Sequence, residues 1–288
     1  MVPVKETGGR EARAAPAPGT STLPRSVGPA HLRASLRQTV AIAWQLARLD
    51  LVRRYTSTML GLAWATLTPL GMGIVIGVVF SRLFGTSLRD FLPYLFCGLI
   101  LWTYFVACID GGAIALLAAE GYIKQIPGVS FFAYPLRMVL AAMVALVMGL
   151  VAVVLVTFAL GRTPTLAWIT LLPALLAWGL FGLAVCCASA VVNTALRDFT
   201  YIQTVAVQAL FYATPIMYPP TLLADHGLAW MLTFNPVYHL IMLVRTPIAF
   251  GQVAPLPHWV AAGLMIGLLL PAGLLALHAA RRRVVFWL

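Results

Sequence analysis

Long apolar segments recur along the chain and alternate with short polar ones. Several reach the about 20 residues that a helix needs to cross ~30 Å of hydrocarbon. Membrane-spanning β-strands would instead alternate apolar and polar residues over about ten positions, and these segments do not. The pattern predicts an all-α membrane protein with six transmembrane helices, at residues 60–81, 92–118, 134–160, 165–192, 199–218 and 257–280.

The chain before the first span divides into two parts. Residues 1–30 are rich in Ala, Pro, Gly and Arg, so we expect a disordered cytoplasmic tail without a cleavable signal peptide. Residues 31–57 are predicted to form a basic amphipathic helix that carries Trp44 and lies on the anionic inner membrane surface. The alternative is a helix that merely caps the first span. Residues 58–288 then form the transmembrane domain.

A further apolar stretch, at about 228–250, is interrupted by polar groups and prolines. It contains Asn235, Pro236, His239, Arg245 and Pro247. Polar side chains and broken backbone at this density are tolerated in a bilayer only where they are shielded from lipid. We therefore predict a re-entrant or surface-lying pair of helices, placed as a gate before the last span, and not a seventh span.

The distribution of Lys and Arg supports this count. With six spans and the N-terminus inside, the outer segments hold only Arg82, Arg89, Arg162 and Arg245, and all other Lys and Arg residues lie inside. This is the asymmetry that the positive-inside rule requires. A seventh span would place Arg281-Arg282-Arg283 outside. The expected topology is therefore multi-pass with both termini in the cytoplasm.

The composition excludes several classes of protein. Of the 288 residues, 61% are hydrophobic and only 9% are charged, which rules out a soluble enzyme, a soluble binding module and a disordered chain. The net charge of +11 follows from membrane orientation, so no nucleic-acid partner is expected. The four cysteines lie in apolar runs without metal-ligand spacing, which predicts small buried residues and no metal site: Cys97, Cys108, Cys186 and Cys187.

The sequence contains no recognisable catalytic motif. It lacks the phosphate loop GxxxxGK[ST], the GxSxG elbow and the HExxH pair, and its histidines are scattered. We expect a chain that is no enzyme and holds no cofactor; an intramembrane enzyme acting on lipid phosphate is the weaker alternative. Asp110, the one acidic residue inside a predicted span, is either a functional carboxylate or lies near the inner headgroups. A proton-coupled carrier would need more such groups.

Short motifs along residues 35–280 resemble, in their order, the ABC-2-type permeases of bacterial polysaccharide exporters. They include Arg53-Arg54-Tyr55, Leu60-Gly61-Leu62-Ala63-Trp64, Gly98-Leu99-Ile100-Leu101-Trp102, Pro215-Ile216-Met217-Tyr218 and Asn235-Pro236-Val237-Tyr238-His239. The resemblance implies a homodimeric permease that works with two copies of a separate ABC subunit, which binds ATP and Mg. That family moves lipid-linked polysaccharides (O-antigen, capsule or teichoic acid) across the inner, or plasma, membrane. An ABC-2 permease for drugs or simple lipids is the alternative within the family.

The resemblance also assigns roles to residues. The loop of Glu120, Gly121, Tyr122, Ile123 and Lys124 would be the coupling helix that docks on the ATPase; without the resemblance, an ordinary cytoplasmic loop is the alternative. Asn235, Pro236, His239 and Arg245 would belong to the outer gate. Arg53 and Arg54, at the inner end of the first span, would bind the substrate phosphate as charge-assisted donors, although either one can instead serve only as topogenic charge.

Aromatic and amide side chains on the first, second and fifth spans are candidates for a conduit. Their flat apolar faces would stack on sugar rings without tight, position-specific bonding. The alternative is that most are ordinary interfacial anchors, which spacing alone favours. The candidates are Trp64, Trp102, Tyr104, Phe105, Tyr201, Gln203, Gln208, Phe211 and Tyr212.

Overall fold

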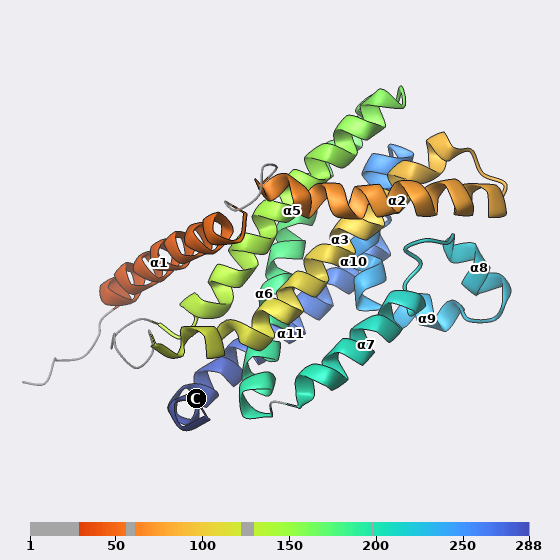
Figure 1. Ribbon diagram of the computed structural model, residues 1–288. Coiled ribbons are helices and arrows are strands. Elements are labelled where there is room, and N and C mark those ends of the chain that lie inside the picture. Colours follow the sequence, from red (N-terminus) through yellow and green to blue (C-terminus); the bar gives the residue numbers. More distant parts are fainter. Residues whose placement is uncertain (1–28, 56–60, 122–129, 197, 288) are drawn as a thin grey trace, which may run out of the picture.

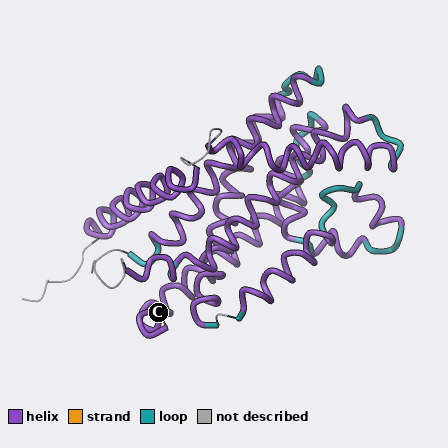
Figure 2. The backbone as a smooth tube through the Cα atoms, in the orientation of Figure 1, coloured by secondary structure: helices purple, strands orange, loops and turns teal. Residues whose placement is uncertain are grey.

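The computed structural model describes residues 29–55, 61–121, 130–196 and 198–287. Within these ranges the regular elements are all helices, and no strand occurs (Figures 1 and 2). The tail expected at residues 1–30 lies outside the described residues up to residue 28, and its last two residues, 29 and 30, belong to a helix. The coupling-loop residues 122–124 also lie outside the described residues. The predicted all-α fold is confirmed.

Five helices in the described ranges are long and apolar enough to cross a membrane. They are Thr66–Leu83 in α2 (Trp64–Leu83), Leu88–Ala115 (α3), Ala133–Ala159 (α5), Leu166–Ala195 (η3, Leu166–Thr170, with α6, Leu171–Ala195) and Leu256–Arg281 in α11 (Leu256–Trp287). Each overlaps one of the predicted spans at 60–81, 92–118, 134–160, 165–192 and 257–280. The chain is therefore a multi-pass membrane protein.

The span predicted at 199–218 is a shorter helix than expected. Helix α7 (Phe199–Ala213) has 15 residues and rises only about 22 Å. Thr214 leaves the helical conformation, with φ −99° and ψ 128°, because the Pro215 ring disfavours a helical residue before it. The predicted boundary at 218 is wrong for this reason, and a sixth crossing of the membrane stays a prediction.

The chain between α7 and α11 is broken into short pieces. Helices α8 (Pro220–Asp225) and α9 (Ala229–Phe234) have no buried residue and lie beyond the end of α7 (Figure 1). Helix α10 (Pro236–Arg245) and the π-helical turn η4 (Thr246–Phe250) are largely buried instead, and α10 packs against α3, α6 and α11. The polar part of the predicted gate is thus shielded by protein, as the hydrocarbon would require.

Helix α3 lies at the centre of the bundle and packs against α2, α5 and α6. Its aromatic side chains form the main core with Trp178 and Phe181 of α6. Near its end, α3 approaches α6 so closely that a Cβ on Gly112 would lie 2.6 Å from the carbonyl oxygen of Cys186. All four cysteines are buried and unpaired, as predicted.

Helix α1 (Pro29–Tyr55) precedes the bundle and packs against α5. Small side chains, Ala43 and Ala47, are buried on it, whereas Trp44 is half-exposed. Asp50 lies 3.6 Å from Arg137, a buried arginine near the start of α5. The helix predicted at 31–57 is therefore present within two residues at each end, and its position on the inner membrane surface stays a prediction.

The close approach of α3 and α6 is testable. Gly112→Val should lower the apparent melting temperature by roughly 3–10 °C, because overpacking costs about 1–3 kcal/mol. Gly71→Val on α2 is the matched control, since nothing lies within 4 Å of a Cβ there. A thiol-reactive dye reports unfolding directly, because the cysteines are buried. Equal melting temperatures for the two variants would show that the helices can move apart at no cost.

Candidate functional site

A buried arginine organises the break between α7 and α10. Arg245, at the end of α10, is fully buried. Its guanidinium donates hydrogen bonds to the carbonyl oxygens of Pro215, at 2.7 Å, and Ile216, at 3.2 Å. The same group stacks over the ring of Tyr94 in α3, 3.8 Å from the ring centroid. Gly98 makes room for it, because a Cβ at that position would collide with the guanidinium.

Tyr94 and Asn235 complete the bonding of this break. The Tyr94 hydroxyl lies 3.1 Å from the carbonyl oxygen of Pro215 and 2.8 Å from that of Tyr218. The Asn235 side chain accepts hydrogen bonds from the first backbone N–H groups of α10 and donates one to the Thr214 hydroxyl at 2.8 Å. Side chains therefore satisfy the backbone carbonyl and N–H groups that have no hydrogen-bond partner within a helix.

The four residues predicted for the gate thus lie in one connected region. Asn235 caps α10, and Pro236 follows at its first position, where a missing N–H costs nothing. Arg245 ends the helix, and His239 lies between them, half-buried. The structure brings all four into the packed part of the segment. Their action as a gate stays a prediction.

An ion pair joins the loop that follows α5 to the start of α3. Arg162 lies 2.5 Å from Asp90, in the first turn of α3, and also donates to the carbonyl of Ala249 in η4. Arg89 donates to the carbonyl of Leu160 at 2.5 Å. In the sequence these arginines stand out only as predicted outer charges, because their partners are 71 or more residues away in the chain.

The predicted aromatic conduit divides into buried and exposed members. Trp102, Tyr104 and Phe105 are buried in the core of α3. Tyr104 bonds to the carbonyl of Trp178 at 3.2 Å, and Phe105 stacks on Phe181 with ring centroids 5.9 Å apart. In the single chain these three side chains serve packing. Whether they also face a conduit in an assembly stays a prediction.

The exposed members lie mainly on α7. Tyr201 and Tyr212 are 76% and 63% exposed, Gln208 is exposed, and Phe211 turns back to contact Trp102 edge-on at 5.2 Å. Trp64, which begins α2, is 48% exposed. Helix α7 runs along the side of the bundle (Figure 1), so it carries an uncovered aromatic face.

Gln203 has a different position from the other conduit candidates. It is 7% exposed, and its side-chain oxygen accepts a hydrogen bond from Asn193 at 2.9 Å. Ser189 lies 2.8 Å from the same oxygen and 2.8 Å from the carbonyl of Ile109. Thr200 donates to Asn193 at 2.7 Å. This buried network ties the turn between α6 and α7 to α3, and the sequence analysis did not anticipate it.

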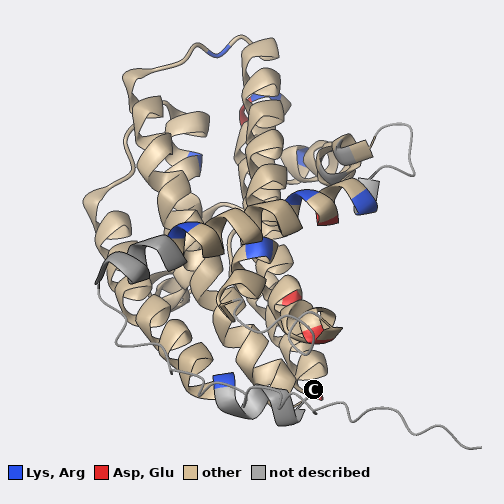
Figure 3. Cartoon of the chain, turned by 90° about the vertical axis from the view of Figure 1, so that its left-hand side faces the viewer, with Lys and Arg blue, Asp and Glu red and all other residues tan. Residues whose placement is uncertain are grey.

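The remaining predicted residues lie near the opposite end of the bundle. Arg53 is exposed near the end of α1, and the side chain of Arg54 is outside the described part. Figure 3 shows that α1 carries several charged residues. Glu120 is half-buried and Gly121 is exposed, just before the undescribed residues of the coupling loop. Asp110 is exposed in the last part of α3.

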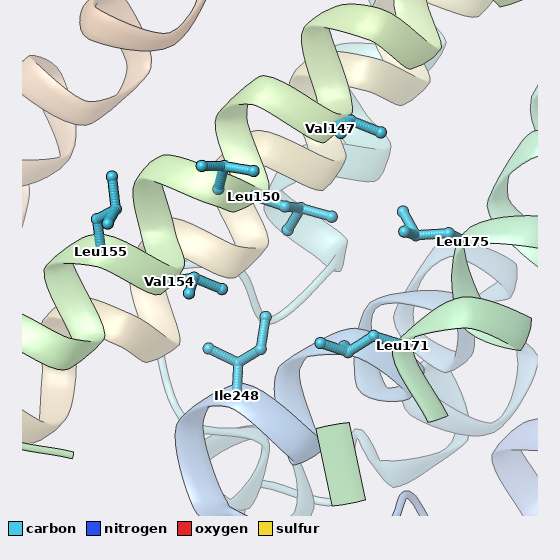
Figure 4. A pocket seen from close by; sticks show the side chains of 8 residues that line it. Val147, Leu150, Val154, Leu155, Leu171, Leu175 and Ile248 are labelled. Atoms are coloured by element: carbon cyan, nitrogen blue, oxygen red, sulfur yellow. The ribbon is translucent and has the colours of Figure 1, made fainter. Parts of the chain in front are cut away.

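An apolar cavity on the bundle does not offer chemistry. It has a volume of about 190 Å³ and lies between α5, α6 and η4, lined only by aliphatic side chains such as Val147, Leu171 and Ile248 (Figure 4). Such a lining provides no nucleophile, acid, base or metal ligand. It suits the chain of a lipid rather than a polar substrate.

Comparison with known proteins gives the family. The sequence model of the ABC-2 type transporters matches residues 41–248. The O-antigen export system permease protein RfbA of Klebsiella pneumoniae is 26% identical over 201 residues, which cover 68% of this chain and 75% of the relative. Its counterpart in Myxococcus xanthus is 28% identical over the same length and coverage. Since the match spans most of the chain and includes α2 to α10, the protein belongs to the ABC-2 type transporter family.

Proposed function

We propose that this chain is the permease subunit of an ATP-driven ABC exporter that carries lipid-linked polysaccharide of the O-antigen kind out across the inner membrane. The observation that carries the proposal is the similarity to relatives named O-antigen export permeases, over two thirds of the chain. The apolar helical bundle supports it. ABC-2 permeases act with an ABC subunit that binds ATP, and this chain has no phosphate loop of its own.

The arrangement of helix ends supports cytoplasmic termini. The ends of α3, α6 and α11 and the start of α5 gather at one end of the bundle (Figure 1). Two of the predicted inner charges, Arg137 near the start of α5 and Arg281 near the end of α11, belong to these helix ends, as the positive-inside rule requires. Glu120 and Gly121, the described residues of the coupling loop, follow α3 at this end, where an ATP-binding subunit would dock under this proposal.

The uncovered face of α7 supports a second copy of the chain. Tyr201, Val205 and Tyr212 are 63–76% exposed, and the Gln208 amide is exposed on the same helix. Lipid hydrocarbon cannot form hydrogen bonds with an amide, so within the bilayer core such a face would need a partner or a water-filled path. A homodimer that brings two α7 helices toward each other would provide both the partner surface and a water-filled path.

This pairing would create the path for the polymer. Exposed tyrosine rings offer a flat apolar surface with a polar edge, which suits a hydroxylated chain that must slide.

The lipid-linked pyrophosphate carries charge, and a charge at the centre of the bilayer costs several kcal/mol. Arg53, exposed near the C-terminal end of α1, and Arg54 would bind this pyrophosphate before transport. The break held by Arg245 would close the outer end.

The coupling loop gives the first test of this proposal. Replacing Tyr122, Ile123 and Lys124 together by Ala should weaken co-purification of the ATP-binding subunit by roughly 30-fold, the loss expected for a binding hot spot of about 2 kcal/mol. Surface O-antigen should disappear with it. Thr163→Ala, an exposed position in the loop at the opposite end, is the control. Normal co-purification and export in the triple variant would remove the coupling assignment.

The two glutamines of α7, Gln203 and Gln208, allow the proposed polymer path to be tested separately from the stability of the fold. Gln208→Ala and Tyr212→Ala should reduce the export rate several-fold without changing the melting temperature, because both side chains are exposed. Gln203→Ala should lower the melting temperature, because it removes the buried oxygen that accepts from the Asn193 amide and lies 2.8 Å from the Ser189 hydroxyl, at about 0.5–1.5 kcal/mol for a lost hydrogen bond.

Leu155→Ala, 62% exposed on α5, controls for the loss of a lipid-facing side chain. Export is followed as radiolabelled polymer reaching the lumen of inverted vesicles. Unchanged export in both Gln208→Ala and Tyr212→Ala would show that this face does not line the path. An unchanged melting temperature in Gln203→Ala would show that the polar network contributes nothing to stability.

A further inference from the structure

Two histidines from different helices face each other beside the buried break. The Nδ1 atoms of His239 in α10 and His258 in α11 lie 2.9 Å apart, and the ring centroids are 5.1 Å apart. Both side chains are half-buried and therefore reachable from solvent. In the sequence they are 19 residues apart, and no motif links them.

The hydrogen bonds define which nitrogen of His239 is free. Its Nε2 lies 3.0 Å from the carbonyl oxygen of Thr233, and a carbonyl can only accept, so Nε2 carries the proton. The Nδ1 of the neutral ring therefore presents a lone pair toward His258. An imidazole whose second nitrogen donates to a backbone carbonyl is oriented in the way that metal-binding histidines are.

The distance between the two nitrogens fits a shared metal ion. Imidazole nitrogens bind Zn²⁺ at about 2.0–2.1 Å, so two of them at 90–109° around the ion lie about 2.9–3.4 Å apart. The observed 2.9 Å is at the near end of this range. His258 would need to release its Nδ1 proton and carry the proton on Nε2 instead. Both rings would also turn about their side-chain bonds, so that the two Nδ1 lone pairs point to one ion.

We propose that His239 and His258 form a binding site for a divalent transition-metal cation, such as Zn²⁺, Ni²⁺ or Cu²⁺. Soft-to-borderline ions of this kind prefer imidazole ligands. Among the residues that the structure describes, no group of three His, Cys, Asp or Glu side chains could hold a metal, so water completes the coordination. Tyr238 packs its ring near both histidines, at 5.6 and 5.5 Å between centroids, and supports them on one side.

A metal ion at this site would link α10, in the broken segment after α7, to the long helix α11. His239 is on α10, whose end is held by Arg245, and His258 is in the first turns of α11. A bound ion would therefore link two elements by two coordinate bonds in place of one hydrogen bond. The binding itself does not depend on which substrate the permease carries.

Titration with Ni²⁺ tests the site on the full chain, purified in detergent with a histidine-free affinity tag. Calorimetry should show one Ni²⁺ per chain, and His239→Gln and His258→Gln should each weaken binding at least about tenfold. His226→Gln and His278→Gln, both at exposed positions elsewhere, are the matched controls and should bind as the parent does. Binding that persists in both pair variants, or that is lost only in the controls, would overturn the proposal.

A second measurement works on the parent protein alone and needs no variant to fold. Electron paramagnetic resonance of one equivalent of Cu²⁺ should show coupling to two imidazole nitrogens. The folded His258→Gln variant should show one. A parent spectrum with a single nitrogen, or none, would overturn the proposal even if Ni²⁺ binds.

Discussion

The backbone between α7 and α10 leaves carbonyl groups that no helix satisfies, and the structure depends on bonding them away from water. Arg245 and Tyr94 reach the carbonyls of Pro215, Ile216 and Tyr218, and Asn235 caps the helix that follows. A planar guanidinium suits this task, because it donates in several directions and stacks on an aromatic ring at once. If these hydrogen bonds were not made, each buried carbonyl group left without a donor would cost about 1–3 kcal/mol of folding free energy.

This constraint separates a rigid part of the molecule from an uncovered one. Helix α3 provides both the core aromatics and the tyrosine beneath Arg245, so the break between α7 and α10 and the core share one support. Helix α7 is joined to that support at its start, through Gln203 and Asn193, and leaves its aromatic face uncovered. A transporter needs this combination, because a fixed frame must present a surface along which a substrate can move.

Much of this architecture followed from the sequence. Five predicted spans have matching long helices, the segment at 228–250 contains only short helices, and the cysteines are buried. The early end of α7 also had a local cause, because Pro215 follows Thr214 directly. Gln203 and Gln208 could not be separated in the sequence, since both are polar residues in one apolar helix. Only the packing of α6 buries one and leaves the other exposed.

The sequence by itself therefore determined the class of protein and most of its spans, because hydrocarbon thickness acts on local composition. It also carried the family, through short motifs in a fixed order along the chain. The tertiary structure decided which side chains meet. The contacts of Arg245 with residues 215 and 216, of Arg162 with Asp90, and of His239 with His258 join distant parts of the chain. Their partners depend on how helices pack, and packing depends on many weak contacts at once, which no local pattern of residues records.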